Sequence, residues 1–233
     1  MTHPPVRVVT YNILGGRHRR PLAQVVRLVR PDVLLVNESP KQRLLWPWQC
    51  RRLAADWKLR YVAGGRSAGS NMIVVSDRVK VLSRTARSIP QPPATPIRGV
   101  VTVQAAIDGR PVGFVGCHLS LMQDRRAWEL RDHVLVAARA LDGPVVLGGD
   151  LNESPGQPTW QLLSAAGFVD HADEHDFTYP ARVPKRRIDA VFVRGGVTVL
   201  EQRTPEVSAE LLAQASDHRP VGVLVDFTVQ ETR

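Results

Sequence analysis

Polar and acidic side chains stand at the ends of several apolar segments in this chain. Carboxylates, amides and imidazoles recur there: Asn12, Glu38, His118, Asp150, Asn152, Asp189, Asp217 and His218. Burying a carboxylate without a partner is costly, so filling of the core does not explain these positions. If the segment ends converge, they form one polar cleft rimmed by carboxylates, amides and imidazoles.

Such a cleft suits the hydrolysis of phosphate esters. Hard oxygen ligands such as Glu38 bind Mg2+ or Mn2+. A carboxylate orients and activates water, while amides and imidazoles neutralise charge that develops on the phosphoryl oxygens. The metal ion acts as Lewis acid and as template. The residue types therefore predict a phosphoesterase that depends on a divalent metal ion.

Strand and helix patterns alternate along the chain and must position these residues. Apolar, β-branched runs predict strands at residues 6–14, 33–37, 71–76, 100–107, 112–119, 144–150, 187–193, 197–200 and 221–227. Helical spacing predicts helices near residues 21–31, 127–141 and 158–167, and a proline-rich stretch predicts a surface loop at residues 89–96. Many strands with few long helices predict two sheets packed face to face with helices outside, although pattern alone does not separate this from other mixed α/β layouts.

Composition and length agree with one globular domain over residues 1–233. Hydrophobic residues make up 43% and charged residues 23%, which argues against a disordered chain, and neither a repeat nor a long linker divides it. No apolar run approaches the ~20 residues of a membrane helix and no signal-peptide pattern opens the sequence, so we expect a cytoplasmic protein. Cys50 and Cys117 lie in no metal-binding pattern; free buried thiols are expected, with a disulfide as the open alternative.

The formal net charge of +9 favours a polyanionic partner, such as nucleic acid or a phosphorylated lipid or metabolite. A GC-rich genome produces the same excess of arginine, so charge is only a modest argument. Basic clusters adjoin the proposed site residues and predict a basic rim around the cleft: residues 17–20, 125–126 and 185–187. Three tryptophans after Glu38 are interpreted as core residues, with base stacking as the alternative: Trp46, Trp48 and Trp57.

Six motifs in a fixed order carry a family resemblance. They are TYNI, VNES, GCHLS, GGDLNESP, RIDAVFV and SDHRPV, and they run from Thr10 to Val221. In this order the series resembles the endonuclease/exonuclease/phosphatase superfamily, whose members have the DNase-I-like fold. The resemblance implies a four-layer α/β sandwich, with two mainly antiparallel sheets flanked by helices, and a monomer as in most members.

The resemblance also implies a role for each matching residue. Glu38 resembles the principal metal ligand, with Asn12 beside the metal ion or phosphate and Asp217 supporting the metal site. Asp150 resembles the residue that positions or activates the attacking water. Asn152 resembles the amide that holds a phosphoryl oxygen.

The remaining matches belong to the phosphate-binding part of the family site. His218 resembles the histidine that contacts the scissile phosphate, with Asp189 as its orienting partner. His118 matches a second histidine, which binds phosphate or acts as an acid at the leaving group. Arg98 matches a phosphate-binding arginine, and Thr178 matches a threonine ahead of the RID motif.

One departure from the family pattern concerns His118. Some family nucleases carry a glutamate on the preceding strand that pairs with this histidine, whereas the matching stretch here, SNMIVVS, begins with Ser70 and Asn71. His118 is therefore expected to lack a carboxylate partner, which argues against a close DNase-I-type mechanism with a strong general acid.

These features predict a Mg2+- or Mn2+-dependent nuclease or related phosphodiesterase that cleaves DNA or RNA by direct attack of water. A phosphatase or phosphodiesterase acting on a phosphorylated lipid or small metabolite is the first alternative, because it needs the same site chemistry and differs only in the rim loops. A binding protein without activity is the second alternative, against which the complete set of acidic residues and histidines argues.

Overall fold

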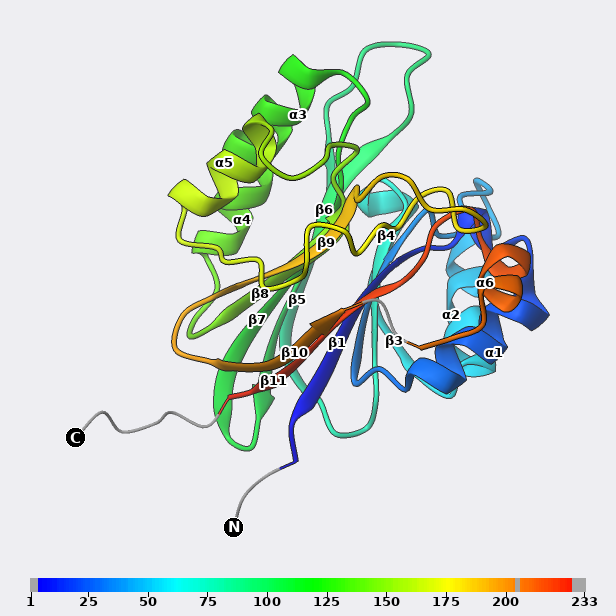
Figure 1. Cartoon of the computed structure of the whole chain (residues 1–233), viewed down its shortest axis with the longest axis horizontal. Helices are drawn as coiled ribbons and strands as arrows, with labels where there is room; N and C mark the ends of the chain where they lie inside the picture. The colour runs from blue at the N-terminus through cyan, green and yellow to red at the C-terminus, as the bar shows by residue number, and fades with distance from the viewer. Residues whose placement is uncertain (1–3, 204–205, 228–233) are drawn as a thin grey trace.

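Two β-sheets form the centre of the protein in a computed structural model, which describes residues 4–203 and 206–227 (Figure 1). Sheet A has the strand order β10-β11-β1-β2-β4-β3, and sheet B has the order β5-β6-β7-β8-β9. Sheet A contains β1 (Val6–Asn12), β2 (Val33–Asn37), β3 (Arg60–Gly65), β4 (Asn71–Val75), β10 (Thr198–Arg203) and β11 (Val221–Asp226). Sheet B contains β5 (Lys80–Ile89), β6 (Arg98–Ile107), β7 (Arg110–His118), β8 (Val145–Asp150) and β9 (Asp189–Arg194).

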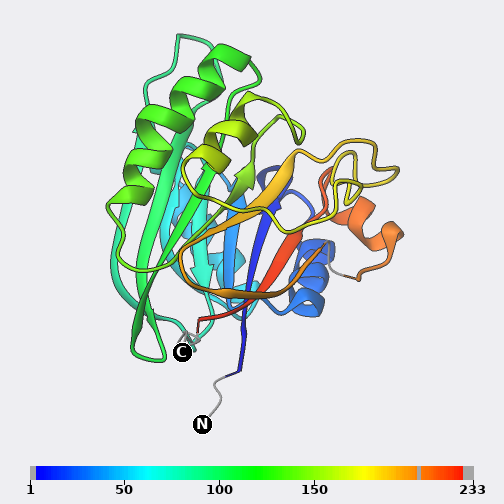
Figure 2. The ribbon, with the colours of Figure 1, turned by 60° about the vertical axis from the view of Figure 1, so that its left-hand side comes forward.

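Helices cover the outer face of each sheet (Figures 1 and 2). Sheet A is covered by α1 (Arg19–Val29), α2 (Trp46–Asp56) and α6 (Ala209–Ala215). Sheet B is covered by α3 (Gln123–Glu129), a π-helical turn (Leu130–Val134), α4 (Leu135–Arg139) and α5 (Pro158–Ala165). Short 3-10 turns follow β1 and β3, at Leu14–Gly16 and Arg66–Ala68.

Three apolar clusters hold these layers together. One lies between the two sheets, and the other two lie between each sheet and its helices. Strand alternation explains the division: in β1, Val8 belongs to the inter-sheet cluster, whereas Val9 and Tyr11 pack toward α1 and α6. The four-layer α/β sandwich with mostly antiparallel sheets, expected from the sequence, is therefore confirmed.

One parallel strand pair in each sheet brings polar residues to the same edge. Asn12 of β1 lies beside Asn37 of β2, and His118 of β7 lies beside Asp150 of β8. The antiparallel pair β8–β9 adds Asp189 opposite Asp150. Because parallel strands end at the same edge of a sheet, the residues at their carboxyl ends are gathered there by register alone.

Several predicted boundaries differ from the observed ones. The first strand ends at Asn12 rather than at residue 14, because Leu14 and Gly15 take positive φ angles and turn the chain. The helix predicted at 127–141 is a helical segment that begins at Gln123 and ends at Arg139. The proline-rich stretch is a loop between β5 and β6, as predicted.

Four elements have no counterpart among the predictions: β3, β5, α2 and α6. The side chains of β5 are mostly exposed, so the strand shows little of the alternation on which strand prediction rests. Its long antiparallel pairing with β6 holds it in place instead. The seven-residue α6 is too short for a strong helical period, but Ser208 caps it by accepting a bond from Leu211 N at 3.3 Å.

The tryptophans after Glu38 do not share one environment. Trp57 is 3% exposed and belongs to the core between sheet A and its helices, as predicted. Trp46 is half-buried and packs against the same core. Trp48 is 56% exposed, so its interpretation as a core residue is wrong: it lies on the outward side of the first turn of α2. Across the described residues, no helix has the length and apolar character needed to span a bilayer.

Candidate active site

The predicted polar cleft forms where the ends of β1, β2 and β8 meet. The Asn12 side chain donates from Nδ2 to Asp150 Oδ2 at 3.0 Å and lies 3.5 Å from Glu38 Oε1. Its amide oxygen accepts a bond from the backbone N–H of Leu14 at 3.2 Å. Asn12 therefore orients two carboxylates that come from different sheets.

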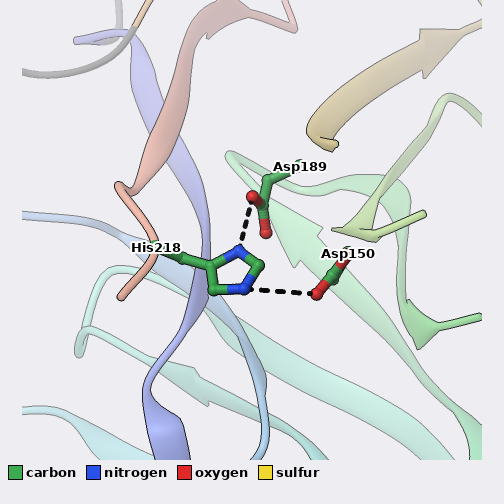
Figure 3. A group of neighbouring side chains, drawn as sticks. All are labelled: Asp150, Asp189 and His218. Carbon is green, nitrogen blue, oxygen red and sulfur yellow. Dashed lines mark hydrogen bonds and ion pairs between the residues drawn. The ribbon is translucent and has the colours of Figure 1, made fainter. Parts of the chain in front are cut away.

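His218 enters the same cleft from the loop between α6 and β11 (Figure 3). Its Nδ1 lies 2.8 Å from Asp189 Oδ2, and its Nε2 lies 3.7 Å from Asp150 Oδ2. All three residues are buried, and Asp189 Oδ1 has no hydrogen-bond partner in the structure. Ligand atoms of the three residues lie within 4.8 Å of one another, which is close enough to hold one metal ion.

His118 occupies the other side of Asp150. Its Nε2 lies 3.1 Å from Asn152 Nδ2 and 3.5 Å from Asp150 Oδ2. Asn152 also donates to the backbone oxygen of Leu119 at 2.8 Å. The carboxylate neighbour of His118 thus comes from β8, not from the preceding strand where some family nucleases carry a glutamate.

The two histidines have opposite protonation preferences. Burial lowers the pKa of His218, but the charge of Asp189, its hydrogen bond and the charge of Asp150 outweigh burial and raise that pKa to about 10. Burial lowers the pKa of His118 to about 3, although the charge of Asp150 opposes this. At neutral pH the metal-free site therefore holds an imidazolium at His218 and a neutral imidazole at His118, the pattern that separates acid and base roles.

Backbone strain occurs at two of the predicted site residues. Glu38 has φ 51° and Asn152 has φ 53°, in the left-handed region that side chains with a Cβ rarely adopt. The backbone oxygen of Glu38 accepts from Gly15 N at 2.8 Å, and the backbone N–H of Asn152 donates to Asp150 Oδ1 at 2.9 Å. These bonds hold both residues in costly conformations, which in proteins cluster at functional sites.

Asn37 joins the two sheets directly beneath the site. Its Nδ2 donates to Asn71 Oδ1 at 2.8 Å and to the backbone oxygen of Cys117 at 2.7 Å. Its Oδ1 accepts the backbone N–H of Asp150 at 3.0 Å. Sequence reasoning did not include Asn37 in the site, although a buried amide at the end of an apolar strand was a visible signal.

Two further residues support His218 from behind and were also missed. Ser216 Oγ donates to the backbone oxygen of Asn12 at 2.7 Å and accepts from His218 N at 3.3 Å. The Tyr179 ring lies 4.8 Å from the His218 ring, centroid to centroid. Ser216 was visible only as part of the SDHRPV motif, and no sequence signal marked Tyr179.

Thr178 and Arg98 lie in very different surroundings. Thr178 is fully buried, and its hydroxyl accepts the backbone N–H groups of Ile188 and Asp189 at 3.2 Å each, so it holds the start of β9. Arg98 is also buried, but its Nε has no partner. Burial lowers the pKa of Arg98, against the charges of Glu129, Asp150 and Glu38. Its Nη1 donates to the backbone oxygen of Ile97 at 3.3 Å. A buried guanidinium that keeps a free Nε beside an acidic cleft suits an incoming phosphate.

A hard divalent cation fits the residues of this cleft. Glu38 and Asp217 are half-buried, Asp150 and Asp189 are buried, and Asp189 Oδ1 is unpaired. Carboxylate oxygens are the ligands that Mg2+ prefers, so Glu38 with Asp150 or Asp217 suits Mg2+ better than a set that includes an imidazole nitrogen. The 2.8 Å contact between His218 and Asp189 is itself a hydrogen bond that needs no ion.

The predicted basic rim needs one correction. Arg126 is buried and donates to Glu153 Oε1 at 2.9 Å, and Arg187 is buried and pairs with both carboxylate oxygens of Asp170 at 2.6 and 2.7 Å. Arg126 therefore ties α3 to the loop after β8, and Arg187 ties the segment before β9 to the loop after α5, so neither is available to a ligand. Exposed positive charge near the cleft remains at Arg17, Lys41, Lys185 and Arg186.

Comparison with known proteins agrees with the geometry. A model described as the Endonuclease/Exonuclease/phosphatase family matches residues 9–218. The chain belongs to this family. No curated protein sequence matches it.

Solved structures of the family share its fold at low sequence identity. An endonuclease/exonuclease/phosphatase from Bacteroides vulgatus has a TM-score of 0.76 and 17% identity, covering 97% of this chain and 100% of that one. A mannosyl-6-phosphatase from Bacteroides thetaiotaomicron has a TM-score of 0.75 and 17% identity, and the match covers 95% of this chain and 100% of that one. D. rerio TDP2 complexed with a single-strand DNA product has a TM-score of 0.73 and 18% identity, and the match covers 95% of this chain and 99% of that one. At such identity these neighbours establish the fold, and the family assignment makes the chain a phosphoesterase.

Proposed function

We propose that the protein hydrolyses phosphodiester bonds in nucleic acid with the help of Mg2+ or Mn2+. The observation that carries this proposal is the convergence of three site residues on one carboxylate oxygen. Asn12, His118 and His218 reach Asp150 Oδ2 at 3.0, 3.5 and 3.7 Å. A carboxylate fixed from three sides suits the positioning of a single attacking water.

The residues of the chain divide the chemical work. Asp150 orients the water and takes one of its protons as the water oxygen bonds to phosphorus. Asn152 and His218 donate hydrogen bonds to the phosphoryl oxygens, and Arg98 supplies positive charge. The bond between phosphorus and the leaving oxygen breaks, and that oxygen departs with the electron pair and takes a proton from solvent.

Orientation of these groups depends on residues behind them. Asp189 holds the imidazole of His218 from Nδ1, so that Nε2 faces the cleft. Glu38, with Asp217 and the neighbouring carboxylates, would hold the metal ion. When bound, that ion supplies a Lewis acid that withdraws charge from the phosphoryl group.

Nucleic acid is the substrate class that the charge of the chain favours. A net charge of +9 attracts a polyanion. The fold neighbour solved with a single-strand DNA product supports this choice. A phosphatase or phosphodiesterase of a phosphorylated lipid or small metabolite is the second candidate, because the mannosyl-6-phosphatase has the same fold.

Hydrolysis assays separate these candidates. Plasmid DNA, RNA and a small phosphodiester are each incubated with Mg2+, Mn2+ or EDTA, and Asp150→Asn is compared with wild type. Loss of a general base costs roughly 10²–10⁴-fold in rate. Asp132→Asn, which neutralises an exposed carboxylate on the helical layer of sheet B, is the matched control and should retain full activity.

Each outcome has a distinct meaning. Metal-dependent cleavage of DNA or RNA that is lost in Asp150→Asn supports the nuclease proposal. Metal-dependent turnover of the small substrate alone assigns the protein to the second candidate. Absence of turnover on every substrate rejects the nuclease proposal and the phosphodiesterase form of the second candidate.

A further inference from the structure

A basic groove lies beside the active site, between the turn after β1 and the first turns of α2. Its lining includes Gly16, Arg17, Lys41, Trp48, Arg52 and Leu53, and its volume is about 390 Å³. We name it the α1–α2 groove, because α1 and α2 lie together on the outer face of sheet A (Figure 1). None of the proposed catalytic residues belongs to it.

The groove opens next to the cleft. Gly15, at its edge, donates its backbone N–H to the backbone oxygen of Glu38 at 2.8 Å. Pro40 and Lys41, two and three residues after Glu38 in the chain, form part of the lining. A ligand that leaves the cleft past Glu38 therefore enters the groove.

The lining of the groove is positively charged. It contains Arg17, Arg19, Lys41 and Arg52 and no acidic residue. Of these four basic residues, Arg19 pairs with a carboxylate, that of Asp56, at 3.1 Å from its Nε. By contrast, a second hollow, of about 590 Å³ and lined in part by α6, contains Glu210 and Asp217 as well as Arg182. A polyanion is therefore favoured in the α1–α2 groove over this second hollow.

Trp48 gives the groove a second kind of contact. Its side chain is 56% exposed at the lining, and the guanidinium of Arg52 lies 4.9 Å from the centroid of its ring. An exposed indole that is held in place by an arginine offers a face on which a nucleobase can stack. Stacking of this kind requires a base that is free of its own neighbours, as in a single strand.

We propose that the α1–α2 groove binds the single-stranded nucleic acid that continues from the scissile phosphodiester. The phosphates lie against Arg17, Lys41 and Arg52, and one base stacks on Trp48. This inference rests on the proposed nuclease function and names the form of its substrate. A concave groove with separated charges and one aromatic face fits a strand better than the flat surface of a membrane.

Binding of a fluorescent single-stranded oligonucleotide tests the groove without catalysis. Anisotropy is measured in EDTA, so the strand stays intact. Trp48→Ala should weaken binding by about 5- to 150-fold, and Trp48→Phe should restore most of the affinity. Arg17→Ala should reduce the slope of log affinity against log salt by about 0.7. Arg139→Ala, which removes one exposed charge from the helical layer of sheet B, should change neither quantity.

Two outcomes overturn the groove assignment. One is unchanged affinity in both Trp48→Ala and Arg17→Ala. The other is tighter binding of vesicles that contain an anionic lipid, lost in the same variants, with no oligonucleotide binding.

Failure of the nuclease proposal is measured separately. If wild-type protein binds the oligonucleotide through the groove but hydrolyses no phosphodiester with Mg2+ or Mn2+, the groove assignment stands and the nuclease proposal fails. If both proposals hold, Trp48→Ala lowers cleavage of the oligonucleotide more than cleavage of a small diester.

Discussion

Replacement of Asn37 by alanine should damage stability and catalysis together. The change removes the bonds that Asn37 donates to Asn71 Oδ1 and to the backbone oxygen of Cys117. It also removes the bonds that Asn37 Oδ1 accepts from the backbone N–H of Asp150 and, at 3.5 Å, from the hydroxyl of Thr10. Asn37, Asn71, Cys117 and Asp150 are all buried, so bulk water does not replace the lost partner. The Thr10 hydroxyl keeps the backbone oxygen of Leu35 as a partner, so three groups lose theirs. An unsatisfied buried group costs ~1–3 kcal/mol, and three of them predict a loss of roughly 3–9 kcal/mol in the free energy of unfolding.

The catalytic effect follows from the position of Asp150. Its backbone loses the bond that fixes it to sheet A, and a displacement of ~1 Å costs on the order of 10²-fold in rate. Urea unfolding measures the stability, and hydrolysis of the preferred phosphodiester measures the rate. Because small domains have ~5–15 kcal/mol in total, the assay is run at a temperature where circular dichroism reports a folded variant.

Gln104→Ala provides the matched control. Gln104 is a buried amide that makes two bonds to the backbone of Asp142, at 2.8 and 3.1 Å, at the end of sheet B away from the site. This variant should lose stability and keep its rate constant. The reasoning is refuted if Asn37→Ala loses less than ~1 kcal/mol, or if it loses stability but hydrolyses substrate as fast as Gln104→Ala.

Three further predictions use other parts of the structure. In metal-free protein, nitrogen NMR should find His218 protonated through neutral pH and His118 neutral, because their pKa values are about 10 and about 3. The contribution of His218 to stability is complete below its unfolded pKa of ~6.5 and is lost as the pH rises toward 10. The contribution of His118 to stability is present above pH ~6.5 and is lost as the pH falls toward 3. Titration of either ring between pH 6 and 8 would contradict these assignments. Burial raises the pKa of the Cys50 thiol to about 11 and that of the Cys117 thiol to about 12. Iodoacetamide at pH 8 should therefore label both thiols only after unfolding. Rapid labelling of the folded protein would refute their burial. Mg2+ or Mn2+ at 100 times its dissociation constant should raise the melting temperature by about 5–10 °C. EDTA should remove this increase, and Glu38→Ala should abolish it. An equal increase in the Glu38→Ala variant would mean that the ion binds elsewhere.

The parts of the fold that the sequence predicted are those with a strong local pattern. β1, β2 and β8 are apolar runs, and α1 has a continuous apolar face, so each was visible without tertiary information. β5 was not, because its neighbours and not its own pattern determine its conformation. Nine of its 10 residues pair with residues 98–106 of β6, and this contact, not a local pattern, defines the strand.

The site could be predicted in composition and, through the family motifs, in the pairing of His218 with Asp189, but most of its other contacts were not visible in the sequence. Ordered motifs identified Asp150 and His218, but which carboxylate reaches which nitrogen depends on how the two sheets face each other. The Asp150 neighbour of His118 is one example, since it lies 32 residues away in the chain but adjacent in the sheet. Burial was equally hard to predict from residue type, because the charged Arg187 is buried and the aromatic Trp48 is exposed.

The neighbours of β1 in sheet A bear on the order in which the protein can form during translation. β1 pairs on one side with β2, which follows it closely, and on the other side with β11, more than 200 residues later. A nascent chain therefore carries an open strand edge on β1 until β11 leaves the ribosome, and an open edge invites pairing with other chains. His218 arrives in the same segment as β11. A ribosome-bound chain that stops before this segment therefore has neither a closed sheet nor a complete active site, and phosphoesterase activity begins only after both have formed.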